Sequence, residues 1–144
     1  MISTDNTNKN KTKPVHQTDS FFVPIPEGAN LGGSILCRTI LENAKMKRCN
    51  FEDRVSGKGA DFGGANLNGA QLEDSILVKA NLRVATLRGA NLTNCNLRGA
   101  ILAGADLKDC NLSGCNLQNA NLRGANVLGA NFDLASPVHM SNSI

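Results

Sequence analysis

The chain has 144 residues, a formal net charge of +3 at pH 7 and an aromatic content of only 3%, with no Trp or Tyr. This length accommodates one domain, and no apolar run reaches the ~18–20 residues that a membrane helix needs. The polar segment Met1–Ser20 has no apolar signal region, so the sequence predicts a cytoplasmic protein, with the nucleus as the alternative.

The N-terminal segment 1–28 is predicted to be a disordered tail followed by a short cap. Met1–Ser20 is rich in Asn, Lys, Thr and Ser, a composition typical of disordered chains. Phe21–Pro26 is apolar and contains two prolines. It would cover the open end of a repeat domain, or else it is a linker or a short motif for a partner.

A five-residue period begins at Ala29 and dominates the rest of the chain. Five repeats run from Ala29 to Asp53, and fifteen more follow without a slip from Ala60 to Leu134. In the second block the third place of each repeat holds Leu twelve times, Phe twice and Val once, and the first place holds only Ala, Cys or Ser. The second place is mostly Asn or Asp, and the fifth is often Gly. Such a fixed internal period indicates a repeat architecture.

The period of five favours short strands over helices. Places one and three are two residues apart, so both point to the same side of an extended chain, while places two and four point to the other side. Each repeat therefore has an inward small–large apolar pair, and place five suits a corner because Gly, Asn and Asp tolerate turn dihedrals. A helix is disfavoured because five does not match the 3.6 residues of its turn. Since one repeat cannot bury its Leu alone, we expect successive coils to stack as in solenoids, at about 4.8 Å per coil.

The segment 54–59 separates the two blocks and holds one residue more than a repeat. We expect the coil to continue through it with a local bulge, because Gly57 and Gly59 allow the required dihedrals. A phosphate-binding loop is not indicated by Gly57-Lys58-Gly59, since the G-x-x-x-x-G-K-[ST] spacing is missing.

The pattern A-[DN]-L-x-x resembles the pentapeptide-repeat family, over Ala60–Leu134 without a break. The resemblance implies an all-β fold, a right-handed quadrilateral β-helix with four repeats per coil and the central Leu in its interior. The count of repeats then gives about five coils, with the β-helix over 29–135. Pro137 cannot donate to a ladder, so residues 136–144 are predicted to form a C-terminal tail.

Three of the five cysteines occupy the first place of a repeat and are predicted to point inward: Cys95, Cys110 and Cys115. Their spacing matches no zinc site. Cys95 and Cys115 would stack in adjacent coils, but parallel Cβ directions disfavour a disulfide between them. We interpret all three as buried, reduced, structural thiols, and a redox or metal role is the alternative.

With four repeats per coil, residues twenty apart share a face. The first face carries Arg83 and Arg123 at place four, and the second carries Arg88 and Lys108, whereas the third is more acidic. These four residues are the candidate partner-binding site, for a protein partner of acidic character. The alternative is ordinary solvated charge.

Catalytic and cofactor sites are not indicated by the sequence. The alignment of coils places Glu52 near Glu73 and Asp53 near Asp74, but no nucleophile accompanies these carboxylates, and both histidines lie in the tails. We therefore predict a protein that is not an enzyme, with no catalytic residue, no cofactor, no metal site, no small-molecule substrate and no membrane association.

A closer resemblance covers about Ala44–Ser143 and includes positions outside the repeat pattern. Its motifs are Cys49–Asp53, Asn81–Leu87, Asn94–Ala100, Leu112–Cys115 and Pro137–Ser141. They are similar to the C-terminal repeat region of those animal BTB/POZ proteins, of the potassium-channel-tetramerisation-domain family, that carry pentapeptide repeats. The resemblance implies a cullin-RING ubiquitin-ligase adaptor whose repeats present the substrate. Only 28 residues precede the first repeat, fewer than the ~50 of a folded domain, so we expect no direct cullin binding.

The function predicted is a non-enzymatic protein–protein interaction scaffold, similar to the substrate-presenting half of such an adaptor. One alternative is a DNA-mimicking pentapeptide-repeat protein that binds a topoisomerase, but mimicry needs a strongly acidic surface and this chain is net basic. A second alternative is direct nucleic-acid binding through the basic faces, which would depend on salt. It is disfavoured for single strands because aromatic stacking platforms are missing.

Overall fold

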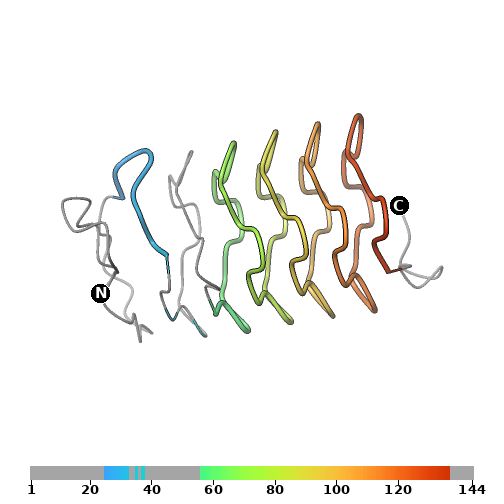
Figure 1. Ribbon diagram of the computed structural model, residues 1–144, viewed down its shortest axis with the longest axis horizontal. Helices are drawn as coiled ribbons and strands as arrows, with labels where there is room; N and C mark the ends of the chain where they lie inside the picture. The colour runs from blue at the N-terminus through green and yellow to red at the C-terminus, as the bar shows by residue number, and fades with distance from the viewer. Residues whose placement is uncertain (1–24, 33–34, 36, 38–55, 137–144) are drawn as a thin grey trace.

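The structure, a computed structural model, describes residues 25–32, 35, 37 and 56–136 (Figure 1). In this part the backbone winds into coils that stack along one axis, so that segments of successive coils lie side by side (Figure 1). Its residues form no helix with the length and apolar character needed to cross a membrane. The stacked coils are the solenoid that the period of five predicts.

Neighbouring coils are joined by parallel bridges between place-two residues that are twenty apart, with one exception at Ile35. The bridges form four columns, which we number as the first to the fourth face: Asp61–Asn81–Ile101–Asn121, Asn66–Thr86–Asp106–Asn126, Gln71–Asn91–Asn111–Asn131 and Ile35–Ser56–Ile76–Asn96–Asn116. Each face contributes one bridged position per coil, so the described residues have isolated bridges rather than extended strands. The predicted solenoid with four repeats per coil is confirmed over 56–136, whereas its handedness and its total number of coils stay predictions.

Backbone hydrogen bonds hold each bridge from both sides. Leu67 N donates to Thr86 O at 2.7 Å, and Thr86 N donates back to Ala65 O at 2.9 Å. A third bond joins the corners, from Gly69 N to Arg88 O at 2.9 Å. The N–H groups of places two, three and five therefore donate to the backbone of a neighbouring coil, whereas the N–H group of place four has no backbone acceptor.

Each repeat ends in a corner at places four and five. Place five has a positive φ in every repeat from Gly64 to Leu134, and the following place-one N–H donates back across the corner, as from Ala65 to Phe62 O at 2.9 Å. A positive φ at the third residue of such a turn is the pattern of a type II turn, which favours Gly or Asn there. The predicted corner is confirmed, although Val84 adopts a φ of 51°, which is strained for a β-branched residue.

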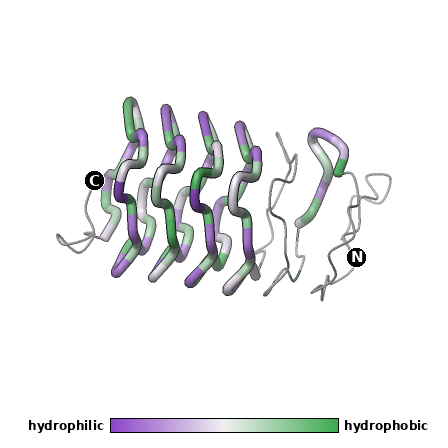
Figure 2. Tube along the Cα trace, turned by 180° about the vertical axis from the view of Figure 1, so that it is seen from behind, coloured by the Kyte–Doolittle hydropathy of each residue, from purple (hydrophilic) through white to green (hydrophobic). Residues whose placement is uncertain are grey.

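The interior consists of the inward side chains of places one and three. From Ala60 to Leu122 every one of them is at most 1% exposed, and hydrophobic and hydrophilic positions alternate along the coils (Figure 2). Full burial of one Leu contributes roughly 1.5–3 kcal/mol, so the columns of Leu supply the main stabilisation. Val127 and Phe132 are only partly buried, since no described coil stacks beyond them. The inward frame predicted from the period is confirmed.

Gly57, in the segment before the second block, stands at place three, where the repeats of the second block carry a large apolar side chain. A Cβ added to Gly57 would lie 2.8 Å from Leu77 Cδ2 and 3.7 Å from Phe62 Cε2. The missing side chain is therefore replaced by its neighbours, one of which is the larger Phe62 instead of a Leu.

The bulge predicted within 54–59 is not formed by the glycines. Gly57 N donates to Ile76 O at 2.8 Å as a regular place-three residue, and Gly59 has the positive φ of an ordinary corner. The freedom of these glycines therefore serves the core and the turn. The bulge itself stays a prediction, because residues 54 and 55 lie outside the described residues. Ile35 pairs with Ser56 across twenty-one residues, so the additional residue lies between these two.

The register continues at least to Ser136, which the sequence assigned to the C-terminal tail. Ser136 N donates to Cys115 O at 2.8 Å, and the Ser136 hydroxyl accepts from Leu117 N at 2.8 Å and donates to Asn116 Oδ1 at 3.2 Å. Its side-chain oxygen takes the place of the carbonyl that accepts this bond in earlier coils. The predicted N-terminal tail, the apolar segment 21–24 and the rest of the C-terminal tail lie outside the described residues.

Candidate partner-binding site

Asn and Asp at place two hold the backbone of the outward place four in position. Arg83 N donates to Asn81 Oδ1, and Arg123 N donates to Asn121 Oδ1, both at 3.0 Å. These Asx-type bonds satisfy the place-four N–H, which neither the bonds between coils nor the corner bonds use. The place-four side chains therefore project from a backbone that is held in position by hydrogen bonds.

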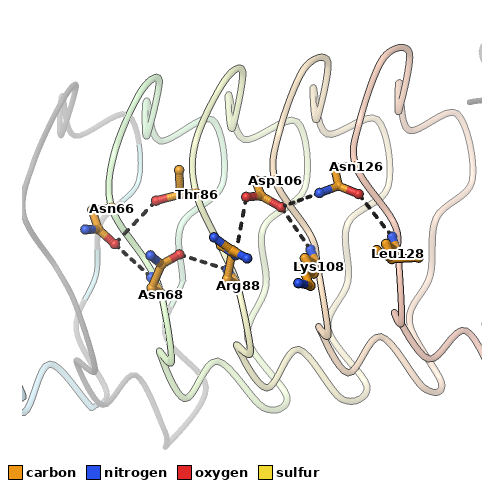
Figure 3. A network of polar contacts seen from close by, with 8 residues as sticks. All are labelled: Asn66, Asn68, Thr86, Arg88, Asp106, Lys108, Asn126 and Leu128. Carbon is orange, nitrogen blue, oxygen red and sulfur yellow. Dashed lines mark hydrogen bonds and ion pairs between the residues drawn. The ribbon is translucent and has the colours of Figure 1, made fainter.

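On the second face these bonds join into a network around Asp106 (Figure 3). Asp106 Oδ1 accepts from Lys108 N at 3.2 Å and from Asn126 Nδ2 at 3.0 Å, and its Oδ2 lies 3.6 Å from Arg88 Nε. Arg88 N donates to Asn68 Oδ1 in the preceding coil at 2.9 Å. The carboxylate thus offsets part of the repulsion between Arg88 and Lys108, although an ion pair this exposed contributes little to stability.

The four predicted partner-binding residues lie on two neighbouring faces. Arg88 and Lys108 are one coil apart on the second face, about 4.8 Å between backbones. Arg83 and Arg123 are two coils apart on the first face, about 10 Å. Both side chains on the first face are exposed, and neither makes an ion pair with any residue that the structure describes. Their charge is therefore not compensated within the described part of the molecule.

Two further cations border the first face and were not among the predicted site residues. Arg98 at place four and Lys79 at place five lie at the corner between the fourth and first faces, and both are exposed. A Cβ added at Gly99 would lie 3.3 Å from Lys79 Cγ, so the Lys79 stem extends toward the next coil. Sequence reasoning treated place five only as a turn position, whereas its side chain also reaches the surface.

The chain matches the family model of pentapeptide repeats, in eight copies over residues 27–53, 65–104 and 100–136. The chain belongs to the pentapeptide-repeat family. Pentapeptide-repeat proteins are in general structural or binding proteins, and the comparisons indicate no enzyme family.

Solved structures of other pentapeptide-repeat proteins are similar to this chain. One from the Arabidopsis thaliana thylakoid lumen is 36% identical, with 54% of this chain and 58% of that protein covered and a TM-score of 0.50. Rfr23 from the cyanobacterium Cyanothece 51142 is 27% identical, with 78% and 86% covered and a TM-score of 0.56. A protein from Nostoc Pcc 7120 is 37% identical, with 61% and 80% covered and a TM-score of 0.53. No curated protein matches the chain, so the resemblance to BTB/POZ proteins stays a prediction.

The cysteines of the pentapeptide-repeat solenoid that the sequence placed inward are buried and free, as predicted. Cys95 Sγ donates to Leu72 O at 2.8 Å, and Cys115 Sγ donates to Leu92 O at 2.9 Å. The hydrogen bond with Cys115, and then burial, raise the pKa of the Cys95 thiol above its ordinary value. Burial raises the pKa of the Cys110 thiol to about 12. Cys95 and Cys110 therefore stay protonated, and protonated thiols are poor nucleophiles and poor metal ligands.

Other chemistry has little support in the described part of this pentapeptide-repeat protein. Its side chains form no group of three or more His, Cys, Asp or Glu that could hold a metal ion. Glu52 and Asp53, which the sequence aligned with Glu73 and Asp74, lie outside the described residues. The surface cations of the first and second faces are thus the groups to consider for an acidic partner.

Proposed function

We propose that this pentapeptide-repeat protein is a non-enzymatic scaffold that binds an acidic protein partner through its first and second faces. The partner contacts Arg83, Arg88, Lys108 and Arg123. The observation that carries the proposal is that Arg83 and Arg123 are exposed and lack an ion pair with any described residue. Uncompensated charge on one side of a molecule attracts a partner of opposite charge and steers its approach.

The hydrogen-bonded backbone behind these side chains also supports the proposal. The place-four N–H groups of Arg83, Arg88, Lys108 and Arg123 all donate to Asn or Asp side chains. A surface that is ordered before binding loses little conformational entropy when the partner arrives. The conformational entropy that the scaffold loses on binding is therefore smaller than that lost by a flexible loop with the same charges, and its affinity is higher for that reason.

The finer proposal is that the solenoid presents a substrate to a cullin-RING ubiquitin ligase, in the cytoplasm or the nucleus. It is supported by the resemblance of Ala44–Ser143 to the repeat region of the BTB/POZ adaptors. In this role the basic faces hold an acidic surface of the substrate.

A charge-reversal experiment tests the proposed function. The full chain is compared with a variant that carries Arg83→Glu, Arg88→Glu, Lys108→Glu and Arg123→Glu, and with a third-face control that carries Thr93→Glu and Ser113→Glu. Partners captured by each are quantified by mass spectrometry at low and high salt. We expect acidic proteins that bind the parent to be lost from the reversed variant, retained by the control and weakened by salt.

Two outcomes count against the proposal. Equal capture by the parent and the reversed variant would show that the basic faces carry only solvated charge. Salt-sensitive binding of duplex DNA, lost in the reversed variant while no acidic protein is captured, would point to nucleic acid instead.

A further inference from the structure

The first face has an apolar interruption in its column of place-two amides. Ile101 stands between Asn81 and Asn121 in the bridge column and is 41% exposed. An isoleucine here gives up the Asx hydrogen bond of its neighbours without becoming buried. Burial in the core therefore does not account for Ile101.

The interruption leaves an unpaired donor on the surface. The N–H groups of Arg83 and Arg123, one coil before and one coil after Ala103, each donate to an Asn side chain. Ile101 offers no acceptor, and Ala103 N donates to none of the described residues. An unpaired N–H at an outward, partly exposed position is available to a carbonyl or carboxylate oxygen of a ligand.

Val84 adds a second exposed apolar side chain at the edge of this face. It is 57% exposed and has a φ of 51°, whereas the other place-five residues of the first face are Gly64, Gly104 and Gly124. A Cβ added at Gly104 would lie 3.2 Å from Val84 Cγ1, so the Val84 side chain leans toward the coil of Ile101. Backbone strain kept for an exposed side chain points to a functional reason.

Four cations frame this apolar centre. Lys79 and Arg98 line one corner of the first face, and Arg83 and Arg123 line the other. All four are exposed, and none makes an ion pair with a described residue. The one carboxylate in the described columns of this face is Asp61, which accepts from Gly63 N and Asn81 Nδ2, both at 2.9 Å.

We propose that the first face binds an extended acidic segment of a protein partner, with an apolar side chain of the segment packed on Ile101 and Val84. Carboxylates on either side of that apolar residue contact the framing cations, and a main-chain carbonyl accepts from Ala103 N. The inference rests on the proposed function, because it specifies the local chemistry of the acidic partner.

The free N–H of Ala103 favours an extended conformation of the segment, and this conformation sets the spacing of its side chains. An extended segment has carbonyl groups that are free to accept, whereas a helix uses its own internally. Alternate side chains of an extended segment point to one side, about 6.7 Å apart. The pattern acidic–x–apolar–x–acidic therefore spans about 13 Å, which flexible Arg side chains on backbones about 10 Å apart can reach.

Synthetic peptides test this chemistry on the full chain. Three fluorescein-labelled peptides, flanked by Gly and Ser, carry Glu-Ser-Leu-Ser-Glu, the same sequence with Ser in place of Leu, and the Leu sequence with both Glu replaced by Lys. Affinity is measured by fluorescence anisotropy. We expect the Leu peptide to bind roughly tenfold more tightly than the Ser peptide, as for a largely buried Leu, and the Lys peptide not to bind.

Two matched protein variants locate the site. Ile101→Asn removes the apolar centre and restores an acceptor for Ala103 N. Ile76→Asn is the control, because Ile76 also stands at place two, on the fourth face, and is 40% exposed. We expect Ile101→Asn to weaken the Leu peptide roughly tenfold or more and to keep or raise the melting temperature. The Ser peptide should weaken less, because it loses only the main-chain contact with Ala103 N. The Ile76→Asn control should bind like the parent.

The outcomes separate this inference from the proposed function. If the Leu and Ser peptides bind equally, and Arg83→Glu with Arg123→Glu weakens both, the acidic-partner function stands and the inference is overturned. If no acidic peptide binds while the parent still captures acidic proteins that the reversed variant loses, the function stands and the inference is overturned; if neither is seen, both fail. If Ile76→Asn weakens the Leu peptide as much as Ile101→Asn does, the apolar contact does not lie on the first face and the inference is overturned.

Discussion

Leu97→Ala is the perturbation that most directly tests the packing of the solenoid. Leu97 is 0% exposed and stands at place three of the fourth face, between Leu77 one coil before and Leu117 one coil after. Truncation removes three carbons from a site whose neighbours are held by backbone bonds on both sides. We expect little collapse around the cavity and a cost of about 3–4 kcal/mol, near the middle of the range for buried Leu→Ala changes.

The expected loss is large enough for a thermal assay. For a chain of this length about 3–4 kcal/mol corresponds to a fall in Tm of roughly 10–15 °C, followed by far-ultraviolet circular dichroism. Urea titration supplies the free energy of unfolding independently. Leu97→Asp should be worse, because it buries an unpaired charge.

The next residue provides the control. Arg98 is exposed and outward, so Arg98→Ala should change the free energy of unfolding by no more than about 0.5 kcal/mol. Equal Tm values for Leu97→Ala and Arg98→Ala would refute the inward frame of the repeat.

Three further predictions concern strain, protonation and core volume. Val84→Asn should raise the free energy of unfolding by about 1 kcal/mol, because Asn tolerates the positive φ; a lower urea midpoint would contradict the strain argument. Because the folded pKa of Cys110 is raised from 9.0 to about 12, its stabilisation is complete below the unfolded pKa and is lost as pH rises toward about 12. Urea midpoints should therefore fall between pH 9 and pH 12, less steeply in Cys110→Ala, and an unchanged slope in that variant would remove the thiol as the cause. Gly57→Leu should destabilise by about 1–3 kcal/mol, because an added Cβ already meets Leu77 Cδ2 at 2.8 Å, and a neutral result in thermal unfolding would mean that the gap is larger than the structure shows.

The repeat frame could be predicted because it depends on single residues and a constant period. The identity of place three determines what is buried, so Leu97 or Cys110 can be assigned without knowing any neighbour. The space at Gly57 could not be predicted, since it depends on how Phe62 and Leu77 pack around it. A glycine is equally compatible with a bulge, a corner and a close approach, and only the pairing between coils decides among them.

The candidate site was partly predictable for the same reason. Arg83 and Arg123 follow from counting twenty residues, but the pairing of Arg88 with Asp106 depends on which way two side chains turn. The apolar centre at Ile101 was overlooked because sequence reasoning examined the surface for charge. The absence of Asn or Asp at place two was a signal in the sequence, because the Asn and Asp side chains at place two of most repeats accept a hydrogen bond from the place-four N–H.

Because residues twenty apart pair, the face on which an outward side chain lies depends on the number of repeats that precede it. Inserting or deleting one whole pentapeptide would leave every Leu inward and every corner at place five, yet it would turn all later repeats by one face. Removal of residues 105–109, for example, would place Arg123 on the fourth face, away from Arg83, with no cost to the register of the core. Proteins of this construction can therefore rearrange a binding surface in quarter turns while the interior stays the same, and comparisons between relatives need to follow faces rather than aligned residues.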